Sequence, residues 1–286
     1  MEPIQFRTDV FVNGKDGYHT YRIPAMVVTR KKRVLAFCEA RRNNHHDTGD
    51  IDLAVKHSDD GGRTWSDLRI VHGEDGDVTV GNPVPIVERE RDRVHLLFVR
   101  DYRRLFYTHS DDEGESWATP REMTEIVAGF GYPYAIIATG PVHGIQMQTG
   151  PLVAPIWMCD RTRADRYKDV TDDRIRAGVL ISDDGGETWR AGGLVPAEVP
   201  LIHEATAAEC RDGSLLINTR AWKAGYRAVA RSTDGGQSWS PPGYGRADRT
   251  PLSRYAYRSL RRRSRHPPRR PLPVVRTRRP ASRRNR

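Results

Sequence analysis

The stretch Ser58-Asp-Asp-Gly-Gly-Arg-Thr-Trp65 is one of four copies of a box in this chain of 286 residues. Every copy keeps serine at its first position, aspartate at its third, glycine at its fifth and tryptophan at its eighth. The other copies are Ser110-Asp-Asp-Glu-Gly-Glu-Ser-Trp117, Ser182-Asp-Asp-Gly-Gly-Glu-Thr-Trp189 and Ser232-Thr-Asp-Gly-Gly-Gln-Ser-Trp239. The repetition indicates one structural unit that is built four times.

The residue types of the box predict a tight turn between two strands. Serine and aspartate side chains accept hydrogen bonds from nearby backbone amides, glycine takes the positive φ of the turn, and tryptophan buries its ring at the next strand. The copies start 52, 72 and 50 residues apart, which is the range of one four-stranded propeller blade. We therefore predict a β-propeller, in which the box carboxylates serve the turns and not catalysis.

Short apolar runs alternate with turn residues along the body of the chain, and no helical period competes with them. Hairpin turns are predicted at Asn13-Gly14, Asp16-Gly17 and Asp212-Gly213. Strands are expected at residues 34–37, 51–55, 85–87, 94–98, 105–107, 152–157, 178–181, 215–217 and 228–230. The body is thus predicted to be nearly all β.

Charge divides the chain into two regions. The net charge is +10, yet residues 245–286 hold 16 arginines against one acid, Asp248, so residues 1–244 carry 31 basic against 36 acidic side chains. We expect two domains, an incomplete propeller over 1–244 and an Arg- and Pro-rich tail over 245–286 that is disordered or frameshifted. A basic tail could also bind nucleic acid or an anionic membrane, although few aromatic residues accompany its arginines.

Composition also limits which cellular compartment and which cofactors the sequence predicts. With 37% apolar residues the chain can bury a core, and no apolar stretch approaches the roughly 20 residues of a membrane span. The first residues lack the pattern of an export signal, and Cys38, Cys159 and Cys210 form no Cys-x-x-Cys pair. These features predict a cytoplasmic protein without a disulfide framework or zinc site.

Further motifs carry a family resemblance. Tyr21-Arg22-Ile23-Pro24, followed by Glu39-Ala-Arg41 and by Asp47-Thr-Gly-Asp50, closely resembles the sialidase (neuraminidase) family, whose fold is a six-bladed β-propeller. The resemblance extends over about residues 17–240, through Gly81-Asn82-Pro83, Thr139-Gly-Pro and the segment from Glu204 to Arg220. The box alone occurs in several unrelated propellers, so these other motifs make the resemblance specific.

The resemblance implies an exo-α-sialidase that hydrolyses terminal sialic acid from an oligosaccharide, glycoprotein or glycolipid, without a cofactor. Sialic acid bears a carboxylate, which planar guanidinium forks bind well. In the family three arginines do this, and Arg22 matches the first while Arg220 matches the second. Arg41 matches a position close to the bound sugar, and Asn82 is expected at the rim of the same pocket.

Catalytic roles follow from the same resemblance. Sialidases replace the usual carboxylate nucleophile of retaining glycosidases by tyrosine, because a second carboxylate would repel the one on the sugar, and a neighbouring glutamate activates the phenol. By resemblance Asp47 is the acid/base residue and Glu204 the partner of the tyrosine. Asp50 and Asp52 compete with Asp47, but their alternation with apolar residues indicates the polar face of a strand.

Two other readings of polar side chains are weaker. His45, His46, Asp47 and Asp50 could be imagined around a metal, yet adjacent histidines on extended chain should point apart, and no further histidine cluster completes a shell. We therefore expect no metal site. His143, in a glycine-rich stretch, is expected to be a hydrogen-bonded structural histidine.

The resemblance stops near Pro242. The family's third arginine and its nucleophilic tyrosine come from later blades, and the setting of Tyr255 and Tyr257 does not match the nucleophile segment. We expect a truncation or a frameshift, with four to five of six blades present. Three functions stay open: a sialidase whose activity in this chain is in question, a non-catalytic glycan-binding propeller, and a nucleic-acid-binding protein that uses its tail.

Overall fold

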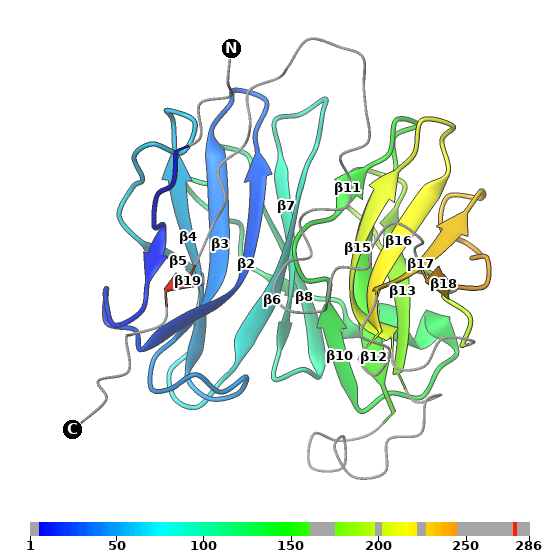
Figure 1. The fold of residues 1–286 in the computed structure, drawn as a ribbon, viewed down its shortest axis with the longest axis horizontal. Coiled ribbons are helices and arrows are strands. Elements are labelled where there is room, and N and C mark those ends of the chain that lie inside the picture. The colour runs from blue at the N-terminus through cyan, green and yellow to red at the C-terminus, as the bar shows by residue number, and fades with distance from the viewer. Residues whose placement is uncertain (1–5, 161–174, 198–201, 222–226, 245–276, 279–286) are drawn as a thin grey trace.

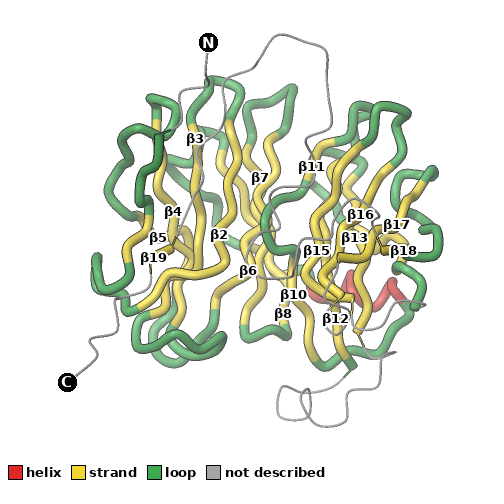
Figure 2. Tube along the Cα trace, viewed as in Figure 1, coloured by secondary structure: helices red, strands yellow, loops and turns green. Residues whose placement is uncertain are grey.

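The computed structural model describes residues 6–160, 175–197, 202–221, 227–244 and 277–278. Figure 1 shows four antiparallel sheets side by side, coloured from blue through cyan and green to orange along the chain. Figure 2 shows that strands joined by turns make up nearly all of the described chain. The predicted all-β propeller is confirmed, and the described residues form four blades.

Each blade places its strands in chain order from one edge to the other. Blade 1 contains β2 (Thr20–Val28), β3 (Val34–Arg41), β4 (Ile51–Ser58) and β5 (Arg69–His72). Blade 2 contains β6 (Val80–Val87), β7 (Val94–Arg100), β8 (Arg104–Ser110) and β9 (Arg121–Glu122). Strands were predicted within β3, β4, β6, β7 and β8, and they are confirmed.

The next two blades repeat the plan. Blade 3 contains β10 (Ile136–Thr139), β12 (Leu152–Cys159), β13 (Ile175–Ser182) and β14 (Arg190–Leu194), and β11 (Ile145–Gln146) also pairs with β12. Blade 4 contains β15 (Ile202–Glu209), β16 (Leu215–Ala221), β17 (Arg227–Ser232) and β18 (Gly243–Tyr244). The first strand of each blade, here called the inner strand, contacts the neighbouring blade, so β2, β6, β10 and β15 face the centre of the array.

The four boxes form the turns that their residues predict. Each begins at the last residue of the third strand of its blade, where the serine Oγ accepts the amide of the fifth-position glycine at 2.8 Å. The aspartate accepts the amide of the seventh residue at 2.8 to 3.0 Å. The glycines have positive φ, as required: Gly62 90°, Gly114 82°, Gly186 87° and Gly236 91°.

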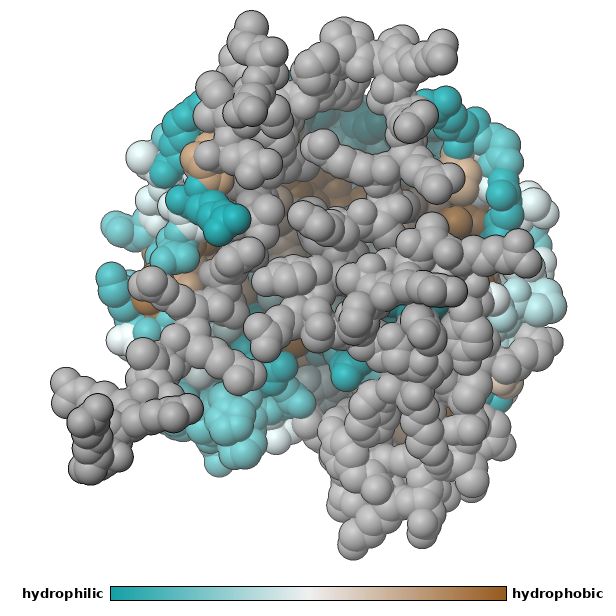
Figure 3. Space-filling model, viewed as in Figure 1, coloured by the Kyte–Doolittle hydropathy of each residue, from teal (hydrophilic) through white to brown (hydrophobic). Residues whose placement is uncertain are grey.

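Apolar side chains fill the spaces between the blades. The largest cluster joins blades 2, 3 and 4 and includes Trp189 and Trp239 of the boxes. Another cluster lies between blades 1 and 2, and the outward face of blade 1 is covered by Phe11 and Tyr18. Hydrophilic residues lie along the flanks of the face that Figure 3 shows. No helix among the described residues is long and apolar enough to cross a membrane.

Besides several strands, two further features were not predicted. A 3-10 helix, η1 (Thr124–Phe130), interrupts the all-β body; it buries Val127 and is capped by Gly131, whose φ is 60°. The second feature is a short parallel pair between β1 (Phe11–Val12) and β19 (Thr277–Arg278). The rest of the predicted tail, 245–276 and 279–286, lies outside the described residues.

Candidate active site

Three of the four inner strands lose their regular pairing near their first residues. The register shifts between Arg22 and Ala25 in β2, between Gly81 and Val84 in β6, and between His203 and Ala205 in β15. In blade 3 the chain instead leaves β10 after Thr139 and continues through Gly140, whose φ is 39°. Bulges re-aim side chains, so this end of the inner strands presents side chains that a regular ladder would place elsewhere.

Hydrogen bonds connect these irregular positions from blade to blade. The Asn82 amide donates to Glu39 Oε1 at 3.1 Å, joining blade 2 to blade 1. The Thr139 hydroxyl donates to the Asn82 carbonyl, joining blade 3 to blade 2. The Ala205 amide donates to the Gly140 carbonyl at 2.8 Å, joining blade 4 to blade 3. The predicted site residues of the first and fourth blades therefore stand on one connected framework.

Arg22 and Asp47 form an ion pair on blade 1. Arg22 Nη1 lies 2.9 Å from Asp47 Oδ1, and the two side chains are 45% and 36% exposed. Asp47 lies in the loop between β3 and β4, as predicted. A guanidinium that is nearly half exposed beside a partly exposed carboxylate can take part in binding an anion from solvent.

Arg41 lies beneath this pair and is only 1% exposed. Its Nη1 donates to Asp47 Oδ1 at 3.0 Å and to the carbonyls of His45 and His46 at 2.6 and 2.7 Å. Its Nε donates to Glu39 Oε2 at 3.1 Å. The structure therefore brings Arg41 to the loop that carries Asp47, and its predicted place close to a bound sugar stays a prediction.

Glu39 is fully buried under Arg41. Burial raises the pKa of the Glu39 carboxyl, while the Arg41 guanidinium and the Asn82 amide oppose that rise. Glu39 was not among the predicted site residues. Its spacing of two residues from Arg41 on a strand puts both side chains on one face, which is the signal that could have paired them.

Glu204 and Arg220 form the second ion pair, on blade 4. Arg220 Nη1 lies 3.0 Å from Glu204 Oε2, and both side chains are about one third exposed. Arg227, which was not predicted, donates to the Glu204 carbonyl at 3.4 Å and to the Asn218 carbonyl at 2.8 Å. Each acid predicted to act on the substrate is thus paired with an arginine predicted to bind it.

Asn82 is nearly buried, and its backbone is held from both sides. Its φ of 57° is left-handed, a conformation that asparagine tolerates better than most residues. Its Oδ1 is buried and has no hydrogen-bond partner among the described residues. The predicted place of Asn82 beside a bound sugar stays a prediction.

The competing acids serve structure. Asp52 lies in β4, is nearly buried and accepts hydrogen bonds from Tyr18 and Arg42, and Asp50 pairs with Arg42 at 3.1 Å. The prediction that both acids lie on a strand is correct for Asp52 and wrong for Asp50, which lies in the loop before β4 (Ile51–Ser58).

One argument about the histidines was wrong. The rings of His45 and His46 lie 4.6 Å apart at 32° and do not point away from each other. The reason is that the chain bends there, where the His46 amide donates to Asn44 Oδ1 at 2.8 Å. No group of three possible metal ligands occurs among the described residues.

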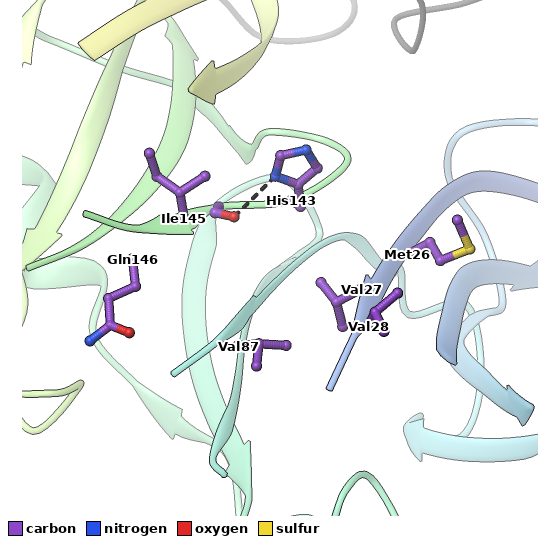
Figure 4. A pocket seen from close by; sticks show the side chains of 8 residues that line it. Met26, Val27, Val28, Val87, His143, Ile145 and Gln146 are labelled. Carbon is purple, nitrogen blue, oxygen red and sulfur yellow. Dashed lines mark hydrogen bonds between the residues drawn. The ribbon is translucent and has the colours of Figure 1, made fainter. Parts of the chain in front are cut away.

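A pocket of about 380 Å³ lies at the opposite end of the inner strands (Figure 4). Met26, Val27 and Val28 of β2 line one side, and His143 and Ile145 line the other. The His143 Nδ1 lies 3.0 Å from the Gly144 carbonyl, and burial lowers the pKa of the imidazole. His143 is hydrogen-bonded, as predicted, and this apolar pocket is separate from the ion pairs.

Comparison with known proteins defines the class. Residues 32–255 match the BNR repeat-like domain family, and the chain belongs to it. The sialidase of Micromonospora viridifaciens is 29% identical over 263 residues, which are 84% of this chain and 39% of the relative. The exo-alpha-sialidase of Arthroderma benhamiae is 31% identical, with 76% and 55% covered, and human sialidase-4 is 28% identical, with 82% and 52% covered.

Solved structures agree with this family. The Hadza microbial sialidase Hz136 superposes with a TM-score of 0.70 at 26% identity, covering 83% of this chain and 48% of that one. The intramolecular trans-sialidase from Ruminococcus gnavus has a TM-score of 0.66 at 18% identity, with 84% and 73% covered, and supports the fold alone. The chain spans about half the length of the curated sialidases it matches.

Proposed function

We propose that this chain acts on sialylated oligosaccharides, glycoproteins or glycolipids as an exo-α-sialidase. The observation that carries the proposal is the pair of partly exposed guanidinium groups, Arg22 and Arg220, each beside a carboxylate at the same end of the inner strands. Sialidase relatives support a hydrolase in general.

In the proposed reaction Arg22 and Arg220 bind the carboxylate of the sugar through charge-assisted hydrogen bonds. Asp47 donates a proton to the glycosidic oxygen, so that the aglycone leaves as an alcohol. A tyrosine forms a covalent bond to the anomeric carbon as the alcohol departs, and Glu204 accepts the phenolic proton. Water, which gives a proton to Asp47, then displaces the tyrosine, which takes its proton back from Glu204, so that sialic acid leaves with retained configuration. Tyr255 and Tyr257 lie outside the described residues, so this chain's nucleophile is not assigned.

A second function is favoured by one observation. In the part of the chain that the structure describes, the Glu204 carboxylate pairs with Arg220, and no tyrosine hydroxyl is bonded to it. A site with carboxylate-binding arginines and no activated phenol would bind sialylated glycans without cleaving them. Such a protein would be a glycan-binding propeller.

A fluorogenic α-sialoside distinguishes the two. Turnover by the full chain that is lost in Asp47→Ala supports the hydrolase, with Asp50→Ala as the matched control because Asp50 lies in the same loop but pairs with Arg42. Binding without turnover supports the glycan-binding protein. If the chain neither binds nor cleaves the sialoside, both functions are excluded.

A further inference from the structure

Glu39 is a buried carboxylate whose two oxygens are used by two different blades. The residue lies on β3 and has no exposed surface. Its Oε2 accepts hydrogen bonds from the guanidinium of Arg41 in blade 1, and its Oε1 accepts one from the backbone amide of Asn82 in blade 2. A buried charge is costly unless it is paired and fully hydrogen-bonded, and both conditions are met here.

On the blade 1 side, Glu39 fixes the guanidinium that holds the Asp47 loop. Arg41 uses Nε and Nη2 on Glu39, which leaves Nη1 aimed at the loop. There Nη1 meets two backbone carbonyls and Asp47 Oδ1. Without the Glu39 carboxylate, the Arg41 guanidinium would keep only its hydrogen bonds to the loop. Contacts on one side alone would no longer fix its orientation.

On the blade 2 side, Glu39 fixes the left-handed residue Asn82. The contact is close, because a Cβ at the preceding residue, Gly81, would lie 2.4 Å from Glu39 Oε1. Glycine at this position therefore lets the two blades approach until the Asn82 amide reaches the carboxylate. The Asn82 carbonyl then continues the framework to Thr139 of blade 3.

We propose that Glu39 is a positioning residue for the candidate site, acting through Arg41 on the Asp47 loop and through the Asn82 amide on the neighbouring blade. The role of the site in binding a sugar acid rests on the function proposed above. The loop-holding role of Glu39 does not, and it can be measured separately.

The test compares Glu39→Gln with Glu88→Gln in the full chain. The side-chain oxygen of glutamine can still accept the hydrogen bond from the Asn82 backbone amide. Its NH2 group would then face Arg41, and it lacks the negative charge that holds the guanidinium. Glu88 is the matched control, since it is also nearly buried and receives Arg91 Nε at 3.0 and 3.1 Å, but at the far end of blade 2. Both variants should lower the melting temperature.

Two readouts separate positioning from general stability. In Glu39→Gln we expect amide hydrogen exchange in residues 42–50 to accelerate at least tenfold, and the Kd for N-acetylneuraminate to rise at least tenfold. In Glu88→Gln neither should change more than about twofold. Equal effects in the two variants, or an unchanged exchange rate in Glu39→Gln, would overturn the proposal.

The two proposals fail in different ways. If the unmodified chain does not bind N-acetylneuraminate, the proposed function fails, while selective exchange in 42–50 still shows that Glu39 holds the loop. If Glu39→Gln does not fold, Arg41→Lys takes its place, because lysine keeps the charge beside Glu39 but cannot also reach the loop carbonyls. Arg41→Lys should then accelerate amide hydrogen exchange in residues 42–50. An exchange rate equal to that of the unmodified chain would overturn the proposal.

Discussion

Arg220 donates to the Glu204 carboxylate across 3.0 Å, and this pair on blade 4 repeats the relation of Arg22 to Asp47 on blade 1. Each guanidinium that is expected to bind the substrate therefore already has a carboxylate partner. An incoming carboxylate has to compete with Glu204 for Arg220. Exposed ion pairs of this kind contribute about 0.2–1 kcal/mol, so the competition is modest.

Removing the competing charge should tighten ligand binding. We expect Glu204→Gln to bind N-acetylneuraminate about two- to fivefold more tightly at pH 7, the fold-change that corresponds to an exposed pair, while any turnover falls. Calorimetric titration measures the affinity. The control is Glu209→Gln on the same strand, whose carboxylate accepts the Gln148 amide at the other end of β15. Equal tightening in both variants would show only a general charge effect.

The boxes should contribute to stability through their buried serines. Ser182 is nearly buried, and its Oγ accepts the Gly186 amide at 2.8 Å. Ser182→Ala leaves that amide without a partner, which should lower the free energy of unfolding by about 1–3 kcal/mol. Urea unfolding measures the change, and Ser240→Ala, at an exposed serine, should cost much less. If Ser182→Ala left the free energy of unfolding unchanged, the box turn would not depend on this hydrogen bond.

Acid should weaken the same turns. Burial disfavours the Asp234 carboxylate, but hydrogen bonds from Ser238, Ser232 and the Gln237 amide outweigh it and lower the pKa to about 2. A carboxyl whose pKa is lowered by folding stabilises the protein above its unfolded pKa of about 3.9 and loses that contribution as the pH falls. The free energy of unfolding should therefore drop from pH 4 toward pH 2, and less steeply in Asp234→Asn. An identical pH slope in the variant would contradict this origin.

Blades 3 and 4 are in contact at a glycine. The Gly193 amide donates to the Gly236 carbonyl at 2.7 Å, and a Cβ at residue 193 would lie 2.3 Å from the Gln237 carbonyl oxygen. Backbone cannot move aside as a side chain can, so Gly193→Ala should destabilise the chain by about 1–3 kcal/mol, the usual cost of overpacking. Gly243→Ala is the control because nothing lies within 4 Å of its Cβ. Thermal unfolding of the two variants checks the difference, and similar melting temperatures would contradict it.

Local chemistry made the fold predictable. Each box carries its own turn, with acceptor, glycine and tryptophan within eight residues, so its structure does not depend on distant parts of the chain. The strands around the boxes followed from apolar runs in the same way. The 3-10 helix at Thr124–Phe130 was missed because a segment of seven residues leaves no clear period.

The site was predictable only where a motif marks it. Arg22, Asp47, Glu204 and Arg220 were assigned by resemblance, and the structure brings them together in two pairs. The burial of Arg41 under Asp47 could not be derived, because it depends on how blade 2 packs against Glu39. The bend at His45 and His46 likewise depends on the fold of a polar loop, where an assumption of extended chain failed.

The most direct test compares N-acetylneuraminate with its methyl ester by calorimetric titration of the full chain. If Arg22 and Arg220 bind one carboxylate, the acid should bind at least tenfold more tightly than the ester, and Arg22→Ala and Arg220→Ala should each remove that preference. Equal binding of acid and ester, or a preference that survives either substitution, would contradict the assignment of this site.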